Sequence, residues 1–125
     1  MCYNISMIIQ IDKILTLNEY INAERANKYA AASLKKKYTE YFANVFNGCE
    51  KITKPIDIHF IWHLNNKRRD LDGISSIMRK FILDGMVESG ILENDNLKWV
   101  QGFQDDVKFI KGDIEAVEIG FKENT

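Results

Sequence analysis

The stretch IDIHFIWHLNNKRRDLDGISSIMRKFILDGMVES, residues 56–89, passes from a strand pattern to a helix pattern within one run of sequence. In residues 56–64, large apolar side chains occupy every second position, which predicts a strand with one buried face. In residues 73–89, apolar side chains recur at intervals of three and four, which predicts an amphipathic helix that ends at Gly90. An apolar strand face followed by an apolar helix face predicts a layered fold.

The residues before this stretch predict one strand and one long helix. Asn4–Ile11 is a short apolar run and is expected to be a mostly buried strand. Thr16 and Glu19 have the spacing of a capping box, so a helix should begin there. Residues 17–46 contain no Pro or Gly and are rich in Ala, which predicts one continuous helix that ends near Asn47-Gly48.

The residues after it predict a turn and short strands. Asn94–Asn96 is expected to be a turn, followed by strands at 97–103, 107–110 and 114–121. Asp105-Asp106 is expected to mark a loop between the first two of these strands. The order of elements predicts an α+β (α/β layered) fold, in which one long and one shorter helix accompany a small mixed β-sheet. We expect a single domain over residues 1–125.

Composition excludes several classes of protein. The chain has 125 residues, 46% of them hydrophobic, and one Pro, which is the balance of a globular domain. Two cysteines make neither a zinc cluster nor a disulfide framework, which favours a reducing, cytoplasmic setting. The first residues lack the features of a signal peptide or a membrane span, so no membrane association is expected. The net charge is −1, but residues 1–69 carry 11 Lys/Arg against 6 Asp/Glu and residues 70–125 carry 6 against 12.

The strongest chemical signal is KRRDLDG at residues 67–73, where the charge changes sign. Two aspartates at i and i+2 at the end of an extended segment, Asp70 and Asp72, point to the same side and can share a hard cation such as Mg²⁺. Arg68 and Arg69 beside them are suited to holding the phosphates that flank an attacked phosphodiester. The alternative is structural, because Asp72 is also a plausible helix N-cap with Asp70 in the preceding turn.

Residues 61–103 resemble the RusA family of Holliday junction resolvases, most closely its short phage and prophage members. The shared pattern is a strand, basic residues with D-x-D, a helix carrying a lysine and a D-G/A-hydrophobic step, and an acidic turn reached through G-h-L-x-x-D. In this chain the corresponding residues are Arg68-Arg69, Asp70-Leu71-Asp72, Lys80, Asp84-Gly85-Met86 and Gly90–Asp95. Two positions depart from the family: Gly73 replaces an Asn, and Ser76 stands where many members carry the lysine.

The resemblance implies a magnesium-dependent endonuclease that cuts branched DNA, such as a four-way junction, as a homodimer in recombination and repair. It places Asp70, Asp72 and Asp95 as metal ligands and Lys80 as the lysine that aids cleavage. On an ideal helix Lys80 is rotated by roughly 80° from Asp72 and lies about 12 Å further along, so the better aligned Arg79 is a possible substitute. Lys67, Arg68, Arg69, Arg79 and Lys80 are the expected DNA contacts, and no organic cofactor is expected.

For the other candidate residues, a purely structural role is an alternative to a functional one. His59 and His63 share a face of the predicted strand about 13 Å apart, so they are expected to be separate sheet histidines rather than joint ligands. Lys35–Lys37 can contact a DNA arm or form a solvated helix face. Trp62 and Trp99 are expected in the core rather than stacked on bases.

Two other functions remain open at this point. One is a catalytically inactive dimer of the same family that binds branched DNA without cutting it. The other is a small phage regulatory protein in which D-x-D merely caps a helix.

Overall fold

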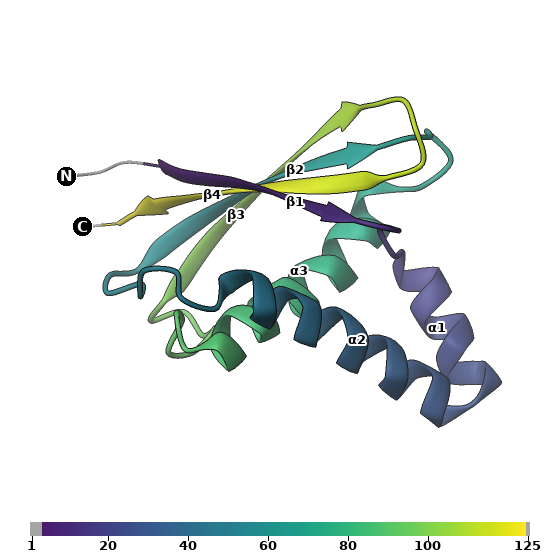
Figure 1. Cartoon of the computed structure of the whole chain (residues 1–125), viewed down its shortest axis with the longest axis horizontal. Coiled ribbons are helices and arrows are strands. Elements are labelled where there is room, and N and C mark those ends of the chain that lie inside the picture. The colour runs from purple at the N-terminus through teal and green to yellow at the C-terminus, as the bar shows by residue number, and fades with distance from the viewer. Residues whose placement is uncertain (1–3, 125) are drawn as a thin grey trace. The chain divides into compact units, whose positions relative to one another are not determined.

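The computed structural model describes residues 4–124 of the chain (Figure 1), with side chains from residue 7 onward. These residues form a mixed α+β fold, which confirms the predicted class. The elements are β1 (Asn4–Ile11), α1 (Leu17–Ala26), α2 (Lys28–Phe46), β2 (Ile56–Leu64), α3 (Leu71–Ser89), β3 (Val100–Phe109) and β4 (Glu115–Glu123). They group into a sheet unit, residues 4–14, 52–68 and 94–124, and a helical unit, residues 15–51 and 69–93.

The sheet unit is a four-stranded sheet in the order β1-β4-β2-β3 (Figure 1). The strand β4 pairs antiparallel with β1 and with β2, and β3 pairs parallel with β2 at one edge. The register aligns Ile9, Val117 and Trp62 across three strands, and all three side chains are buried. The period-two prediction for residues 56–64 is therefore confirmed, and the intervening polar residues lie on the opposite face of the sheet.

The strand β3 differs from the prediction. Residues 97–99 form a turn rather than the start of a strand, and residues 100–109 form one unbroken strand that includes Asp105 and Asp106. Aspartate disfavours strands, but here both carboxylates have partners on the neighbouring strand β2. Asp105 accepts a hydrogen bond from Trp62 Nε1 at 3.0 Å, and Asp106 lies 2.6 Å from His59 Nε2. The predicted loop at Asp105-Asp106 is wrong because these cross-strand contacts outweigh local propensity.

The helical unit begins as predicted and then breaks once. The Thr16–Glu19 capping box is present, which confirms the start of α1 at Leu17. The predicted single helix over 17–46 is wrong, because Asn27 is extended (φ −170°, ψ 154°) and separates α1 from α2. The Asn27 side chain accepts a hydrogen bond from the Ala30 backbone N–H at 2.7 Å, so it caps α2 as a new helix. The end of α2 at Phe46, before Asn47-Gly48, is as predicted.

The helix α3 runs two residues further toward its N-terminus than the predicted 73–89. Asp70 is the extended N-cap residue, although its side chain makes no capping hydrogen bond, and Asp72 lies in the first turn. The predicted N-cap role of Asp72 is therefore wrong. Gly90 ends the helix with φ +88°, a left-handed conformation that glycine adopts without strain, as predicted.

The helices α2 and α3 pack closely at Gly85. A Cβ atom at this position would lie 2.6 Å from Phe42 Cβ and 2.9 Å from the Ala43 backbone nitrogen, so only glycine fits without movement. Nearby, the rings of Tyr38 and Phe81 stack with centroids 5.4 Å apart. The apolar stripe of α3 is buried as its periodicity predicts.

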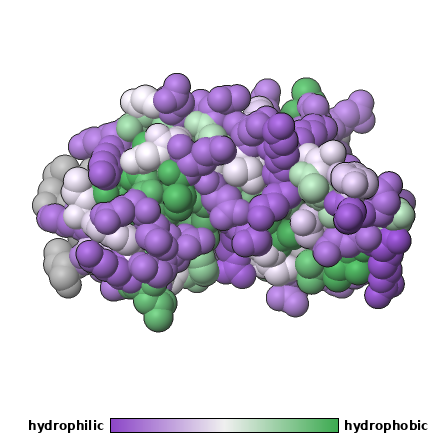
Figure 2. Space-filling view, turned by 90° about the horizontal axis from the view of Figure 1, so that it is seen from below, coloured by the Kyte–Doolittle hydropathy of each residue, from purple (hydrophilic) through white to green (hydrophobic). Residues whose placement is uncertain are grey.

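The outer surface is mixed in character. Figure 2 shows apolar patches divided by hydrophilic side chains on the face that it draws. Within residues 4–124, no helix is long and apolar enough to cross a membrane.

Candidate functional site

The connection from β2 to α3 carries the basic residues of the motif and is held at its start. Glu115 of β4 is buried, and its two carboxylate oxygens accept hydrogen bonds from the backbone N–H groups of Asn65, at 3.0 Å, and Ile14, at 3.1 Å. Asn65 also donates its side-chain amide to the Gly112 carbonyl at 3.0 Å. The basic segment therefore leaves the sheet from a fixed point.

Asp70 and Asp72 lie at the start of α3 with exposed side chains. Their backbone carbonyls are used, by the Ile74 N–H and the Ser75 hydroxyl respectively, but neither carboxylate has a hydrogen bond or ion pair with another residue of the described chain. Only Asp70 is extended, so the two side chains do not both leave an extended segment as expected. Both carboxylates are exposed to solvent, and the positive end of the helix dipole stabilises their negative charge.

Asp95 lies in the sheet unit, in the turn that precedes β3, as predicted for residues 94–96. It is exposed and has no side-chain partner within residues 4–124. Across the same described residues, no three His, Cys, Asp or Glu side chains are gathered into a group that could hold a metal ion.

The two basic residues of α3 point in different directions along the helix. Lys80 Nζ lies 4.0 Å from Asp84 Oδ2, one turn toward the C-terminus, and is exposed. Arg79 instead donates its Nε–H to the Ser75 carbonyl at 3.1 Å, which turns its side chain toward the N-terminal end where Asp72 lies. Within the helical unit, Arg79 is therefore better directed toward the motif than Lys80.

The remaining basic residues of the motif are spread along the connection. Lys67 and Arg68 are exposed in the sheet unit, and Arg69 is half-buried at the beginning of the helical segment. Lys67 Nζ lies 5.0 Å from the ring centroid of Phe109 on β3, a cation–π contact. Asn66 Oδ1 accepts a hydrogen bond from the Arg68 backbone N–H at 3.0 Å, which forms a tight turn here.

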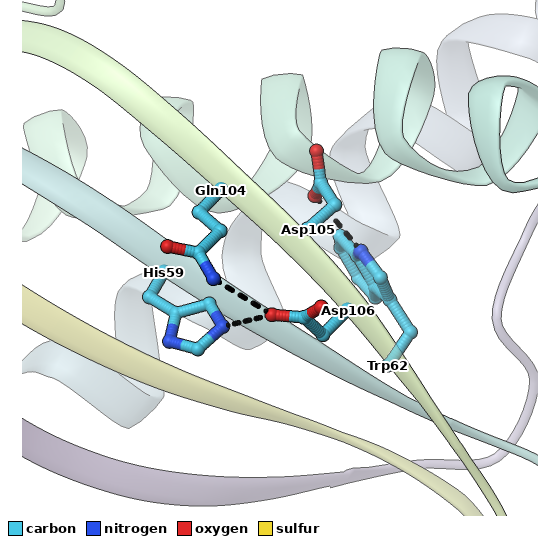
Figure 3. Close-up of polar contacts among 5 residues, drawn as sticks. All are labelled: His59, Trp62, Gln104, Asp105 and Asp106. Carbon is cyan, nitrogen blue, oxygen red and sulfur yellow. Dashed lines mark hydrogen bonds and ion pairs between the residues drawn. The ribbon is translucent and has the colours of Figure 1, made fainter.

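A polar network on the open face of the sheet was not anticipated (Figure 3). His59 Nε2 lies 2.6 Å from Asp106 Oδ2, and Gln104 donates its amide to the same oxygen at 3.0 Å. The hydrogen bond from His59 and then that from Gln104 lower the pKa of Asp106 below its ordinary value of 3.8. The alternation of Asp57 and His59 with apolar residues indicates that both lie on the polar face of a strand. It does not indicate their partners, which are far away along the chain.

The two histidines are separate, as predicted. His63 is nearly buried and lies 3.5 Å from Glu118, whereas His59 is 40% exposed beside Asp106. Trp62 is fully buried as predicted, whereas Trp99 is half-buried in the turn before β3.

Lys35–Lys37 are exposed on α2. Lys36 lies 4.0 Å from Glu40 and Lys37 lies 5.9 Å from the Tyr38 ring centroid. These contacts fit a solvated helix face, and they leave the lysines accessible to an anionic partner.

A scan of this chain against models of known protein families finds no match, and a search of curated proteins also finds none.

Proposed function

We propose that this protein is a magnesium-dependent, structure-selective endodeoxyribonuclease of RusA type, which resolves Holliday junctions by paired phosphodiester hydrolysis in DNA recombination and repair. The observation that carries the proposal is the pair Asp70 and Asp72, which are exposed at the start of α3 without a partner among the described residues. A carboxylate that serves only as a cap would bind the helix N–H groups, and the Asp70 side chain makes no such bond.

In this proposal Asp70, Asp72 and Asp95 hold Mg²⁺. Carboxylate oxygens suit this hard cation, which retains several waters and takes few protein ligands. A magnesium ion held there would supply an activated water for hydrolysis of the phosphodiester and would neutralise charge on the phosphate. The chain supplies the ligands and positions the backbone around the attacked phosphate.

The basic residues of the motif hold the DNA backbone. Lys67 and Arg68 are exposed on the connection and are free to reach flanking phosphates, with Arg69 at its end. Arg79 and Lys80 are the candidates for stabilising charge on the cleaved phosphate. Their directions along α3 favour Arg79.

In this proposal the protein acts as a cytoplasmic homodimer, without an organic cofactor and without membrane association. Paired incisions across a junction need two active sites, and one 14.5 kDa chain offers one. Each subunit would then nick one of two opposed strands.

A second candidate is a dimer that binds branched DNA without cutting it. Three features favour it: Lys80 is engaged with Asp84, Gly73 replaces the usual Asn, and the Ser76 hydroxyl donates to the Gly73 carbonyl at 3.4 Å instead of supplying a lysine. In that case α3 would still contact phosphates, but it would lack the lysine side chain that aids cleavage.

The test is incubation of the purified chain with a labelled four-way junction, and separately with linear duplex of the same sequence, in Mg²⁺ or in EDTA. We expect nicks only on the junction and only in Mg²⁺. Asp72→Asn should abolish cleavage and retain junction binding, whereas Asp113→Asn, which makes the same change at an exposed residue outside the proposed metal ligands, should cleave normally. A shifted but uncut junction with the wild-type chain would favour the binding dimer, and no interaction would refute both.

A further inference from the structure

Three strands place six residues in a two-by-three array on the open face of the sheet. The register aligns Gly120 of β4 with His59 of β2 and Gln104 of β3, and the next row aligns Lys122, Asp57 and Gly102. All six line one hollow of about 280 Å³. The array lies within the sheet unit and shares no residue with the proposed magnesium site of Asp70, Asp72 and Asp95.

Two of the six positions are glycines, and the missing side chain at Gly102 makes room for Asp57. A Cβ atom on Gly102 would lie 2.9 Å from Asp57 Oδ1, so the Asp57 carboxylate extends across the space that a side chain at 102 would fill. Asn124 Nδ2 donates to the same Oδ1 at 2.8 Å and fixes that carboxylate. Asp57 Oδ2 has no partner among the described residues.

His59 and Gln104 are each oriented by Asp106. Because a carboxylate accepts hydrogen bonds, Nε2–H of His59 donates to Asp106, which leaves Nδ1 as the ring nitrogen that can offer a lone pair to a metal ion. The Gln104 amide likewise gives its N–H to Asp106 and leaves Oε1 as a free acceptor. Figure 3 shows Oε1 of Gln104 and the second ring nitrogen of His59 turned away from Asp106 on the same side of the network.

The residues that could bind a metal ion here are themselves held by hydrogen bonds, as ligands in metal sites are. Histidines that bind metals typically donate their other N–H to a carboxylate, and carboxylates that bind metals are themselves hydrogen-bonded. His59 with Asp106 meets the first condition, and Asp57 with Asn124 meets the second. The inner ligands would be one imidazole nitrogen, one carboxylate oxygen and one amide oxygen.

We propose that Asp57, His59 and Gln104 bind a divalent transition-metal ion, with zinc as the representative, and that water completes its coordination. An imidazole ligand favours zinc and its neighbours over Mg²⁺, which prefers oxygen ligands alone. Three protein ligands and one water are the arrangement of zinc sites that keep an open position.

Lys122 adds a positive charge to the proposed site and provides a specific test of the proposal. It is exposed, lies directly across from Asp57, and forms no ion pair within the described residues. Lys122 lines the hollow, so its positive charge should repel a cation bound there. Replacing it with a neutral residue of similar length should therefore strengthen zinc binding, which no purely structural role of the array would produce.

The test is a zinc titration of the tag-free chain by competition with a chromophoric chelator. Cys2 and Cys49 are both replaced by serine so that thiols do not bind the ion. We expect His59→Ala to weaken binding by at least about 100-fold, Asp106→Asn by about 10- to 100-fold, and Lys122→Met to tighten it about five-fold. Asp113→Asn is the matched surface control and should bind as the parent does.

A second readout locates the ion. The ¹⁵N resonance of His59 Nδ1 should shift on addition of zinc, while the ring resonances of His63 should not. Equal zinc affinity in the parent and His59→Ala would overturn the proposal, as would zinc binding that is lost only in the Asp70→Asn/Asp72→Asn double variant. Retention of zinc binding by that double variant supports a separate site, whether or not the chain cleaves DNA.

Discussion

At the scale of single residues, Asp106 receives hydrogen bonds from two side chains on the open face of the sheet. His59 and Gln104 stabilise the charged carboxylate, and the opposing effect of burial is smaller, so the pKa of Asp106 is lowered. A lowered pKa in the folded state stabilises the fold at pH values above the ordinary value of 3.8. That stabilisation is lost as the pH falls through the lowered pKa, and it is small because both His59 and Asp106 are well exposed.

The Asp106 pKa can be measured by NMR titration of its carboxyl carbon. In the wild-type chain it should titrate below 3.8. In His59→Ala the largest contribution is removed, so the Asp106 pKa should rise toward that ordinary value. Identical titration curves in the two proteins would mean that the contact with His59 is not formed.

Arg79 and Lys80 are adjacent on α3, and the proposed function assigns them unequal weight. Arg79 leans toward Asp72, so Arg79→Ala should lower the rate of junction cleavage about ten-fold or more, as for loss of one group that stabilises developing charge. Lys80→Ala removes an exposed pair with Asp84 and should cost only a few tenths of a kcal/mol in stability. Single-turnover cleavage by the two variants measures the difference. A larger rate loss in Lys80→Ala would reverse the assignment.

Glu115 is a buried carboxylate with a structural task, because it binds the backbone where the basic connection leaves the sheet. Glu115→Ala leaves the N–H groups of Ile14 and Asn65 without their acceptor and should lower the free energy of unfolding by about 2–4 kcal/mol. Glu115→Gln keeps one acceptor oxygen and should cost less. Urea denaturation of the three proteins provides the comparison, and an unchanged midpoint for Glu115→Ala would contradict this role.

At the scale of the elements, the close packing of α2 on α3 depends on a glycine, Gly85. Gly85→Ala would place a methyl group against Phe42 and Ala43 and should destabilise the fold by about 1–3 kcal/mol. Gly73 is the matched control, since it lies in the same helix with no atom closer than 4.0 Å to an added Cβ. Gly73→Ala should be neutral or stabilising by up to about 1 kcal/mol, because alanine is the better helix former. Thermal unfolding that ranks the variants in the opposite order would refute the close packing.

Local signals predicted most of the elements, and long-range contacts account for the errors. The capping box at Thr16, the alternation in residues 56–64 and the stop at Gly90 are all read from neighbours in sequence, and each is confirmed. The break at Asn27 was missed because an asparagine within a helical pattern is an ordinary residue until its side chain caps the next helix. The strand through Asp105 was missed because its partner, Trp62, lies 43 positions away.

The two candidate sites also differ in how far the sequence could predict them. The D-x-D motif is contiguous in sequence, so Asp70 and Asp72 could be identified as candidates directly. The array of Asp57, His59 and Gln104 depends on the parallel pairing of β2 with β3, whose partner residues are 45 positions apart for His59 and Gln104. No local pattern encodes that register.

At the scale of the whole molecule, the basic and acidic halves of the sequence do not correspond to the two structural units. The residues assigned to the sheet unit carry 8 Lys/Arg and 9 Asp/Glu, and those of the helical unit carry 9 of each. Each unit is therefore close to neutral, and neither has the strong uniform field that attracts a polyanion. Affinity for DNA must come from local groups such as the exposed Lys67 and Arg68, and it should be sensitive to salt.

The most direct measurement uses a supercoiled plasmid that extrudes a cruciform, a four-way junction in closed circular DNA. A dimer that makes two incisions in one encounter converts this plasmid to the linear form without accumulation of the nicked circle. We predict linear product with the wild-type chain in Mg²⁺, none in EDTA and none with Asp72→Asn. Plasmid that remains intact with the wild-type chain, or equal cutting by Asp72→Asn, would contradict the proposed resolvase activity.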